Sequence, residues 1–163
     1  MDMNDSSVEA SQLDGCDKRV SKVPFYRLYH GQTSDHFYTT NNAEANQAAA
    51  GLGYTREGIS CLIFPSKASG TTALYRLFSP SAGDHFYTAN KQEAENAAQN
   101  LGYNREGIAG YIYLHSGHRG TVPFYRLFSP GTDHFYTTSA PERDNATKNG
   151  YNYEGIVGYV FKS

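Results

Sequence analysis

Four kinds of polar side chain recur along the chain at nearly constant spacing, and their types could support binding or catalysis. Each copy supplies an arginine, an aspartate followed directly by a histidine, and a glutamate. These residues are Arg27, Arg76 and Arg126; Asp35, Asp84 and Asp133; His36, His85 and His134; and Glu57, Glu106 and Glu154. Together with glutamates at a second repeated position, they include nine of the 11 acidic residues in 23–163. A repeated unit therefore places these charges.

The aspartate and histidine begin a D-H-F-Y-T segment that could line a sugar-binding recess. Side chains alternate in an extended strand, so Phe shares one face with Asp and Thr, and Tyr shares the other with His. If Phe anchors the core, His and Tyr lie on the more polar face. Sugars suit such a surface, because aromatic rings contact their C–H groups while polar side chains bond their hydroxyls. The ligand-binding residues expected on this basis, with two neighbouring arginines, are Asp35, His36, Tyr38, Asp84, His85, Tyr87, Asp133, His134, Tyr136, Arg56 and Arg105.

The same residues allow two other interpretations. In a structural one, Asp orients His, and Arg pairs with Asp or Glu inside each unit. In a metal-binding one, the three equivalent histidines form a zinc site with the aspartates behind them. No local pair such as H-x-x-x-H accompanies these histidines, and we expect neither a metal nor a cofactor. Cys61 replaces the glycine of the other copies, Gly110 and Gly158, which indicates a small buried thiol rather than a nucleophile.

Catalytic motifs are missing from the sequence. It contains no G-x-S-x-G, P-loop, G-x-G-x-x-G or H-E-x-x-H pattern. An enzyme usually has one site that breaks the symmetry of its repeats, whereas the polar set here is copied three times. Such copying favours a non-enzymatic, multivalent binding protein, because several weak sites gain avidity on a repetitive ligand.

Three copies of one unit, at residues 23–64, 73–113 and 122–161, position these side chains. Two aromatic runs, Y-R-L-[FY] and H-F-Y-T, are separated by turn residues and predict a β-hairpin. Asn or Ser followed three residues later by Glu predicts the start of a helix, and a later glycine predicts its left-handed C-terminal cap. A closing run with two glycines predicts a bulged strand. Each unit is therefore expected to be β-β-α-β.

The repeats must share a core, because one unit of about 45 residues cannot bury enough surface alone. We therefore expect an α+β, β-rich fold in which three β-β-α-β repeats close into a compact pseudo-threefold ring, propeller-like or barrel-like. Residues 23–163 would form this single domain. Residues 1–22 are polar, hold five of the chain's 16 acids, and are expected to form a flexible N-terminal arm.

Composition and charge exclude several classes of protein. The chain has 163 residues, of which 23 are Tyr or Phe and none is Trp, and its formal net charge is −2. It has no basic stripe, which argues against nucleic-acid binding. No run approaches about 18 apolar residues, so we expect no membrane insertion. The N-terminus lacks the basic and apolar regions of a signal peptide, which predicts a cytoplasmic protein. The sequence leaves oligomerisation open.

All three copies carry the signature Y-R-L-[FY]…D-H-F-Y-T…G-Y-x-x-E-G-I, across residues 23–161. This signature resembles a repeat family of unassigned function found in bacteria and fungi. In bacteria the family is often appended to cell-surface proteins and cell-wall hydrolases, which implies an accessory role in binding carbohydrates or surfaces. The resemblance identifies no site residues. A stand-alone chain without a signal peptide also resembles the cytoplasmic defence lectins of fungi.

The leading hypothesis is thus a multivalent carbohydrate-binding protein, a lectin, with up to three related sites. Its partners would be glycans or glycoconjugates. The first alternative is a protein-interaction module, such as a protease inhibitor, that acts through the variable loops 30–34, 65–72 and 114–121. The second alternative is a metal-dependent hydrolase.

Overall fold

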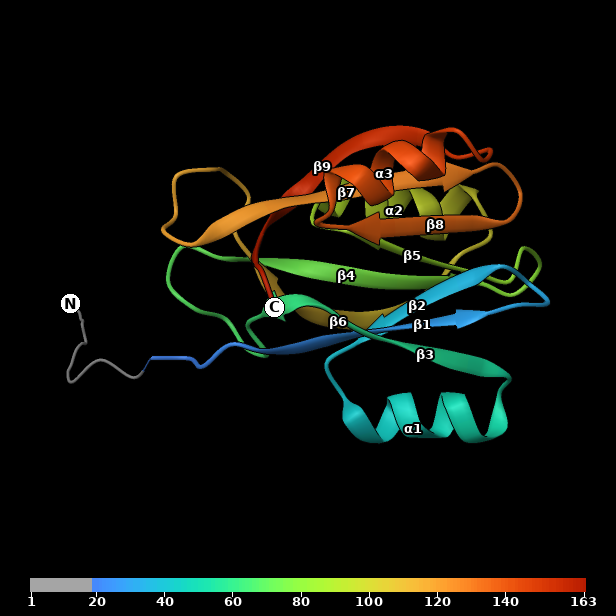
Figure 1. Ribbon diagram of the computed structural model, residues 1–163, viewed down its shortest axis with the longest axis horizontal. Helices are drawn as coiled ribbons and strands as arrows, with labels where there is room; N and C mark the ends of the chain where they lie inside the picture. The colour runs from blue at the N-terminus through green and yellow to red at the C-terminus, as the bar shows by residue number, and fades with distance from the viewer. Residues whose placement is uncertain (1–18) are drawn as a thin grey trace.

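The structure, a computed structural model, describes residues 19–163 and shows a strand, a second strand, a helix and a closing strand in each unit (Figure 1). This is the element order that the sequence predicts. Of the flexible arm expected at residues 1–22, residues 1–18 lie outside the described residues. The first unit comprises β1 (Val23–His30), β2 (Asp35–Thr39), α1 (Asn42–Gly51) and β3 (Tyr54–Ile63). The second comprises β4 (Thr72–Ser79), β5 (Asp84–Thr88), α2 (Lys91–Asn100) and β6 (Asn104–Ile112). The third comprises β7 (Thr121–Ser129), β8 (Asp133–Thr137), α3 (Ala140–Thr147) and β9 (Asn152–Phe161).

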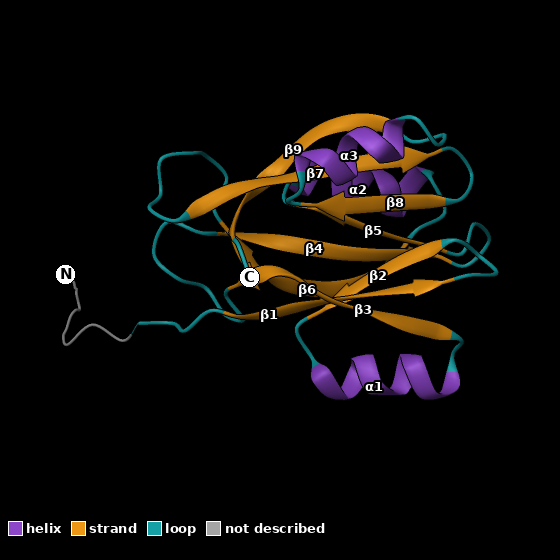
Figure 2. Cartoon of the chain, viewed as in Figure 1, coloured by secondary structure: helices purple, strands orange, loops and turns teal. Residues whose placement is uncertain are grey.

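The strands form two separate antiparallel sheets (Figure 2). The larger sheet has the order β2-β1-β3-β9-β7-β8, and the smaller one has the order β5-β4-β6. The pseudo-threefold ring expected from the sequence, propeller-like or barrel-like, is therefore wrong: the fold is a β-rich sandwich of six and three strands with three short helices. None of the described helices has the length and apolar character needed to cross a membrane.

The unequal sheets follow from unequal joins between the units. Strand β3 pairs with β9 where Leu62 lies opposite Phe161, so the first and third units share a sheet. Within residues 19–163, the second unit meets its neighbours at this end through isolated bridges. These bridges are Phe64–Tyr111 and Tyr113–Tyr159.

Glycine at two of three equivalent positions lets the closing strands approach one another. A Cβ on Gly110 would lie 2.4 Å from Cδ1 of Ile63, and one on Gly158 would lie 2.5 Å from Cδ1 of Ile112. Any larger residue would push the preceding strand away, because the interior is already close-packed. The first unit carries Cys61 at this position, and its join with the third unit is the one where β3 and β9 pair. Cys61 is fully buried, as expected, and burial raises the pKa of its thiol.

The shared core explains why one prediction about the H-F-Y-T strands is wrong. Tyr38 and its two equivalents were expected on a polar face, but they are at most 1% exposed. Each hairpin is covered on both sides: Phe37 packs against Ala45 and Ala48 of its own helix, while Tyr38 packs into the core common to all units. Alternation separates Phe from Tyr, but both faces are buried. The core residues are Phe25, Tyr38, Cys61, Ile63, Leu74, Tyr87, Ile112, Phe124, Tyr136 and Val160.

Candidate functional site

Each aspartate of the D-H-F-Y-T strands holds the histidine of the following unit, not its neighbour in sequence. Asp35 on β2 accepts a hydrogen bond from the backbone N–H of His85 on β5 at 2.8 Å. Its other oxygen lies 2.5 Å from His85 Nδ1 and also accepts a hydrogen bond from the Tyr54 hydroxyl. The equivalent sets are Asp84 with His134 and Tyr103, and Asp133 with His36 and Tyr151. The Asp–His contacts expected within units therefore exist between units.

The three aspartates also approach one another. Their ligand atoms lie within 4.8 Å of each other, and all three side chains are buried. Among residues 19–163, the three aspartates are the side chains that lie close enough together to hold a metal ion. The three histidines do not come together in this way, so they do not form the zinc site considered above. Both oxygens of each carboxylate already accept hydrogen bonds. Their role in the described chain is to link the units.

The core tyrosines link the units in the same direction. The Tyr87 hydroxyl accepts a hydrogen bond from the Tyr38 backbone N–H at 2.7 Å and donates one to the Tyr38 carbonyl at 2.6 Å. Tyr136 makes the same two bonds with Tyr87, and Tyr38 makes them with Tyr136. Desolvation by burial raises the pKa of all three hydroxyls well above the usual value. These rings, which were expected to contact a ligand, have no open face.

The repeated arginines cross the unit boundaries closer to the surface. Arg126 on β7 donates from its two terminal nitrogens to Glu93 on α2, at 2.9 and 2.8 Å, and from Nε to Glu154 on β9, at 2.8 Å. We call such a Glu–Arg–Glu set a charged bridge. The other two charged bridges are Glu44–Arg76–Glu106 and Glu142–Arg27–Glu57.

The sequence predicted a capping role, and no other, for the helix glutamates Glu44, Glu93 and Glu142 of the charged bridges. The Asn90 side chain does accept a hydrogen bond from the Glu93 backbone N–H at 3.0 Å, as an N-cap should. The Glu93 carboxylate, however, accepts from Thr88 Oγ1 and from Arg126 instead of bonding back to the cap. The sequence carries no separate signal for this second role, because Asn or Ser followed three residues later by Glu already fits a helix cap.

The helix glutamate of each charged bridge has a lowered pKa. Desolvation by burial acts to raise the pKa of Glu93, but hydrogen bonds from Arg126 and Thr88 outweigh it and lower that pKa. The same balance lowers the pKa of Glu44 and Glu142. These carboxylates therefore stay ionised at neutral pH, and one guanidinium faces two carboxylates.

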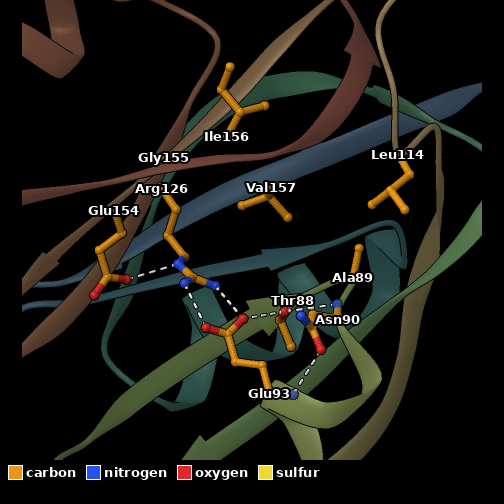
Figure 3. A pocket seen from close by; sticks show the side chains of 10 residues that line it. All are labelled: Thr88, Ala89, Asn90, Glu93, Leu114, Arg126, Glu154, Gly155, Ile156 and Val157. Atoms are coloured by element: carbon orange, nitrogen blue, oxygen red, sulfur yellow. Dashed lines mark hydrogen bonds and ion pairs between the residues drawn. The ribbon is translucent and has the colours of Figure 1, made fainter.

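A recess of about 230 Å³, the Arg126 recess, lies beside one charged bridge (Figure 3). Figure 3 shows Arg126 between Glu93 and Glu154 on one side, with Val157 and Leu114 on the other. The recess thus has a charged wall and an apolar wall. Its lining residues are Thr88, Ala89, Asn90, Glu93, Leu114, Arg126, Glu154, Gly155, Ile156 and Val157.

A neighbouring hollow of about 370 Å³ shares all three members of this charged bridge. It also reaches Leu101 at the end of α2 and His134 on β8. His134 is thus an expected site residue that lines a hollow, although its side chain is mostly buried.

A second recess of about 230 Å³, the Tyr75 recess, lies within the second unit. Its lining includes the half-buried Tyr75 ring, Arg105 and Ile108, the last of which is 50% exposed. In the described part of the chain Arg105 makes no hydrogen bond or ion pair, whereas its equivalent Arg56 donates to the side chains of Asn42 and Asn46.

The tyrosines equivalent to Tyr75 are covered in the other two units. The Arg56 guanidinium lies 5.3 Å from the centroid of the Tyr26 ring. In the third unit, where Tyr153 replaces this arginine, Arg143 from α3 lies 4.5 Å from the Tyr125 ring centroid. No cation lies over Tyr75 among residues 19–163, so the three units differ at this position.

The three variable loops do not form one surface. Loop 30–34 joins β1 to β2 at the end of the molecule where the hairpins turn (Figure 1). Loops 65–72 and 114–121 lie at the opposite end, where residue 19 enters (Figure 1). A single partner would have to span the molecule to contact all three.

The Asp35–His85 pair predicts that folding stability falls as pH rises above neutrality. Desolvation by burial acts to lower the His85 pKa, but hydrogen bonds to Asp35 and Glu106 outweigh it and raise that pKa above the ordinary 6.5. The protonated ring therefore stabilises the folded state below pH 6.5, and this contribution is lost as pH rises through the folded-state pKa. Urea unfolding at several pH values from about 6 to about 9 measures the effect.

Two variants separate His85 from the other titrating groups. His85→Gln should remove the decline, and His115→Gln, in an exposed loop, should leave it unchanged. A wild-type free energy of unfolding that rises over this range, or an unchanged decline in His85→Gln, would contradict the assignment.

Comparison with known proteins gives one match. The model of a family described as "Domain of unknown function (DUF5648)" matches residues 23–161. Searches of curated proteins and of solved structures found no match.

Proposed function

Since the chain belongs to the DUF5648 family, a domain of unknown function, we propose a function from the geometry of its recesses: the protein is a non-enzymatic lectin that binds neutral carbohydrates. Its two candidate sites are the Tyr75 recess and the Arg126 recess. Both combine an apolar surface with planar polar groups, the combination that a sugar ring needs for its C–H faces and its hydroxyls.

The open Tyr75 recess is the observation that carries this proposal. The Tyr75 ring and Ile108 offer an apolar surface, and Arg105 offers N–H donors that no described residue uses. A volume of about 230 Å³ is below the range of roughly 300–1,000 Å³ typical of drug-sized ligands. The recess therefore suits one sugar residue of a longer glycan.

Charge restricts the class of sugar. The Arg126 guanidinium already donates to two carboxylates in the Arg126 recess, so an acidic sugar would find no unpaired cation there. Neutral hydroxyls can accept from the remaining N–H groups of Arg126 and donate to Glu93 or Glu154. Neutral sugars, and amino sugars with an ammonium group, are the ligands that this charge favours.

Two recesses on one chain would act together on a repetitive glycan. Each shallow recess alone would bind weakly, but the second contact is intramolecular once the first has formed. The proposed partners are accordingly glycans or glycoconjugates with repeated units. The two sites need not share one specificity, because their linings differ.

A glycan array followed by calorimetry tests the proposal. Tyr75→Ala should weaken binding of the best ligand about tenfold, since it removes the ring that supports the sugar. Arg105→Ala should weaken it by a similar factor. Tyr26→Ala is the matched control, because the Tyr26 ring is covered by Arg56, and it should change the affinity less than about twofold.

Two results would contradict the proposal. One is the absence of any glycan binding at about 10 mM. The other is an equal loss of affinity in Tyr75→Ala and Tyr26→Ala. Thermal unfolding of each variant shows whether a loss of binding comes from a loss of folded protein.

A further inference from the structure

A separate recess of about 410 Å³ is lined by residues within 19–22 and by residues at the ends of the closing strands β3 and β9. Figure 1 shows these strand ends on the side of the molecule opposite the hairpin turns. The recess shares no lining residue with the Arg126 recess or the Tyr75 recess. Three cations, Arg19, Lys22 and Lys67, line it, and no acidic residue among residues 19–163 does. In a chain with a formal net charge of −2, this is a local concentration of positive charge.

Two of the cations are held in place by the residues around them. Lys22 Nζ lies 4.0 Å from the centroid of the Phe161 ring, within the distance of a cation–π contact. Lys67 Nζ donates to the Thr71 carbonyl at 2.6 Å, which leaves two of its three N–H groups for a ligand. Both ammonium groups therefore lie at the recess without a carboxylate partner among its lining residues.

An aromatic cluster forms the apolar part of the recess. Phe64, Tyr113 and Phe161 come from the ends of the three closing strands and meet edge to face, with centroids 5.7 to 6.2 Å apart. His118 stacks on Tyr113 at 3.7 Å and fixes that ring. The cluster thus requires all three units, and its aromatic edges and faces suit a flat ring.

We propose that this recess binds a small anion joined to a planar ring, with a nucleoside monophosphate as the representative ligand. The anionic group would accept from Lys22, Lys67 and Arg19, and the ring would lie against the aromatic cluster. The volume falls within the roughly 300–1,000 Å³ of small-molecule sites. Because this recess shares no lining residue with the Arg126 recess or the Tyr75 recess, the site does not depend on the proposed carbohydrate binding.

Calorimetry on the full chain tests the site with AMP, adenosine and inorganic phosphate as separate probes. AMP should bind at least about tenfold more tightly than either part alone, because it uses both the cations and the aromatic cluster. Lys22→Gln and Lys67→Gln should each weaken AMP binding about fivefold or more. Lys162→Gln is the matched control, because it removes the same charge beside Phe161 from a residue that does not line the recess, and it should change the affinity less than about twofold.

Three outcomes would overturn the assignment. AMP that gives no binding at about 5 mM would exclude the ligand class. Adenosine that binds as tightly as AMP would show that the cations take no part. An equal loss in Lys162→Gln and Lys22→Gln would reduce the effect to general surface charge. None of these results bears on whether the Tyr75 recess binds sugars.

Discussion

Replacing Tyr87 by phenylalanine is expected to lower the free energy of unfolding by about 2–6 kcal/mol. The hydroxyl is the partner of both the N–H and the carbonyl of Tyr38, at 2.7 and 2.6 Å in the centre of the core. Phenylalanine keeps the ring but leaves both backbone groups buried without a partner, and each such group costs about 1–3 kcal/mol. Tyr87 is 1% exposed, so these two backbone groups lie away from bulk solvent.

Urea unfolding of Tyr87→Phe measures this loss, with Tyr111→Phe as the matched control. Tyr111 lies in the same unit as Tyr87, on the closing strand β6, but its side chain is partly exposed and makes no hydrogen bond within the described residues. The control should change the free energy of unfolding by less than about 0.5 kcal/mol. A Tyr87→Phe protein as stable as the control would show that the hydroxyl does not bridge the units.

The repeats, elements and caps of this fold were predictable because their signals are local. The glycine after each helix, Gly53 for example, has the positive φ of +82° that its C-terminal position requires. Each closing strand shifts register at its Glu-Gly step, as a bulge should. Each of these features depends on residues within one unit.

The arrangement of the units was not predictable from these signals. His36 follows Asp35 directly in sequence, yet its ring lies against Asp133, 97 residues away. Local alternation likewise could not show that both faces of the hairpin are covered, one by a helix and the other by the core of neighbouring units.

The candidate sites lie closer to the surface than the sequence predicted, for the same reason. Most of the residues expected to bind a ligand are buried and link the units, and the open surface lies around the charged bridges and the Tyr75 recess. Of the two expected arginines, Arg56 covers a ring while Arg105 leaves one open. The two units differ in the helix residues near these arginines. The Asn42 and Asn46 side chains hold Arg56 in the first unit, and the equivalent residues in the second unit are Lys91 and Glu95.

All the links between units run in one direction around the molecule. Each unit supplies an aspartate, a helix glutamate and a backbone N–H and carbonyl, and the next unit supplies the histidine, arginine and tyrosine that bind them. Because the third unit supplies the first in the same way, every unit has both neighbours. Removing one link should therefore destabilise the whole domain instead of one unit.

Asp35→Ala tests this coupling and is expected to lower the free energy of unfolding by about 3–5 kcal/mol. Asp35 is fully buried and accepts from the His85 backbone, the His85 ring and the Tyr54 hydroxyl. Alanine leaves the two buried His85 donors and the partly buried Tyr54 hydroxyl unpaired, and it removes the carboxylate that compensates the charge of the imidazole. Asp144→Ala is the matched control, because the Asp144 side chain is 62% exposed, and it should cost less than about 0.5 kcal/mol.

A double-mutant cycle with His85 identifies the pair as the source of the loss. In Asp35→Ala with His85→Ala, the imidazole that the first change left unpaired is also gone, so the double variant should lose less than the sum of the single losses. Additive losses would mean that the two residues stabilise their own units separately. If Asp35→Ala alone is too unstable to measure, Asp35→Asn keeps an acceptor for the His85 N–H and should lose less. Because the two residues belong to different units, a non-additive result means that the first unit holds the second in place.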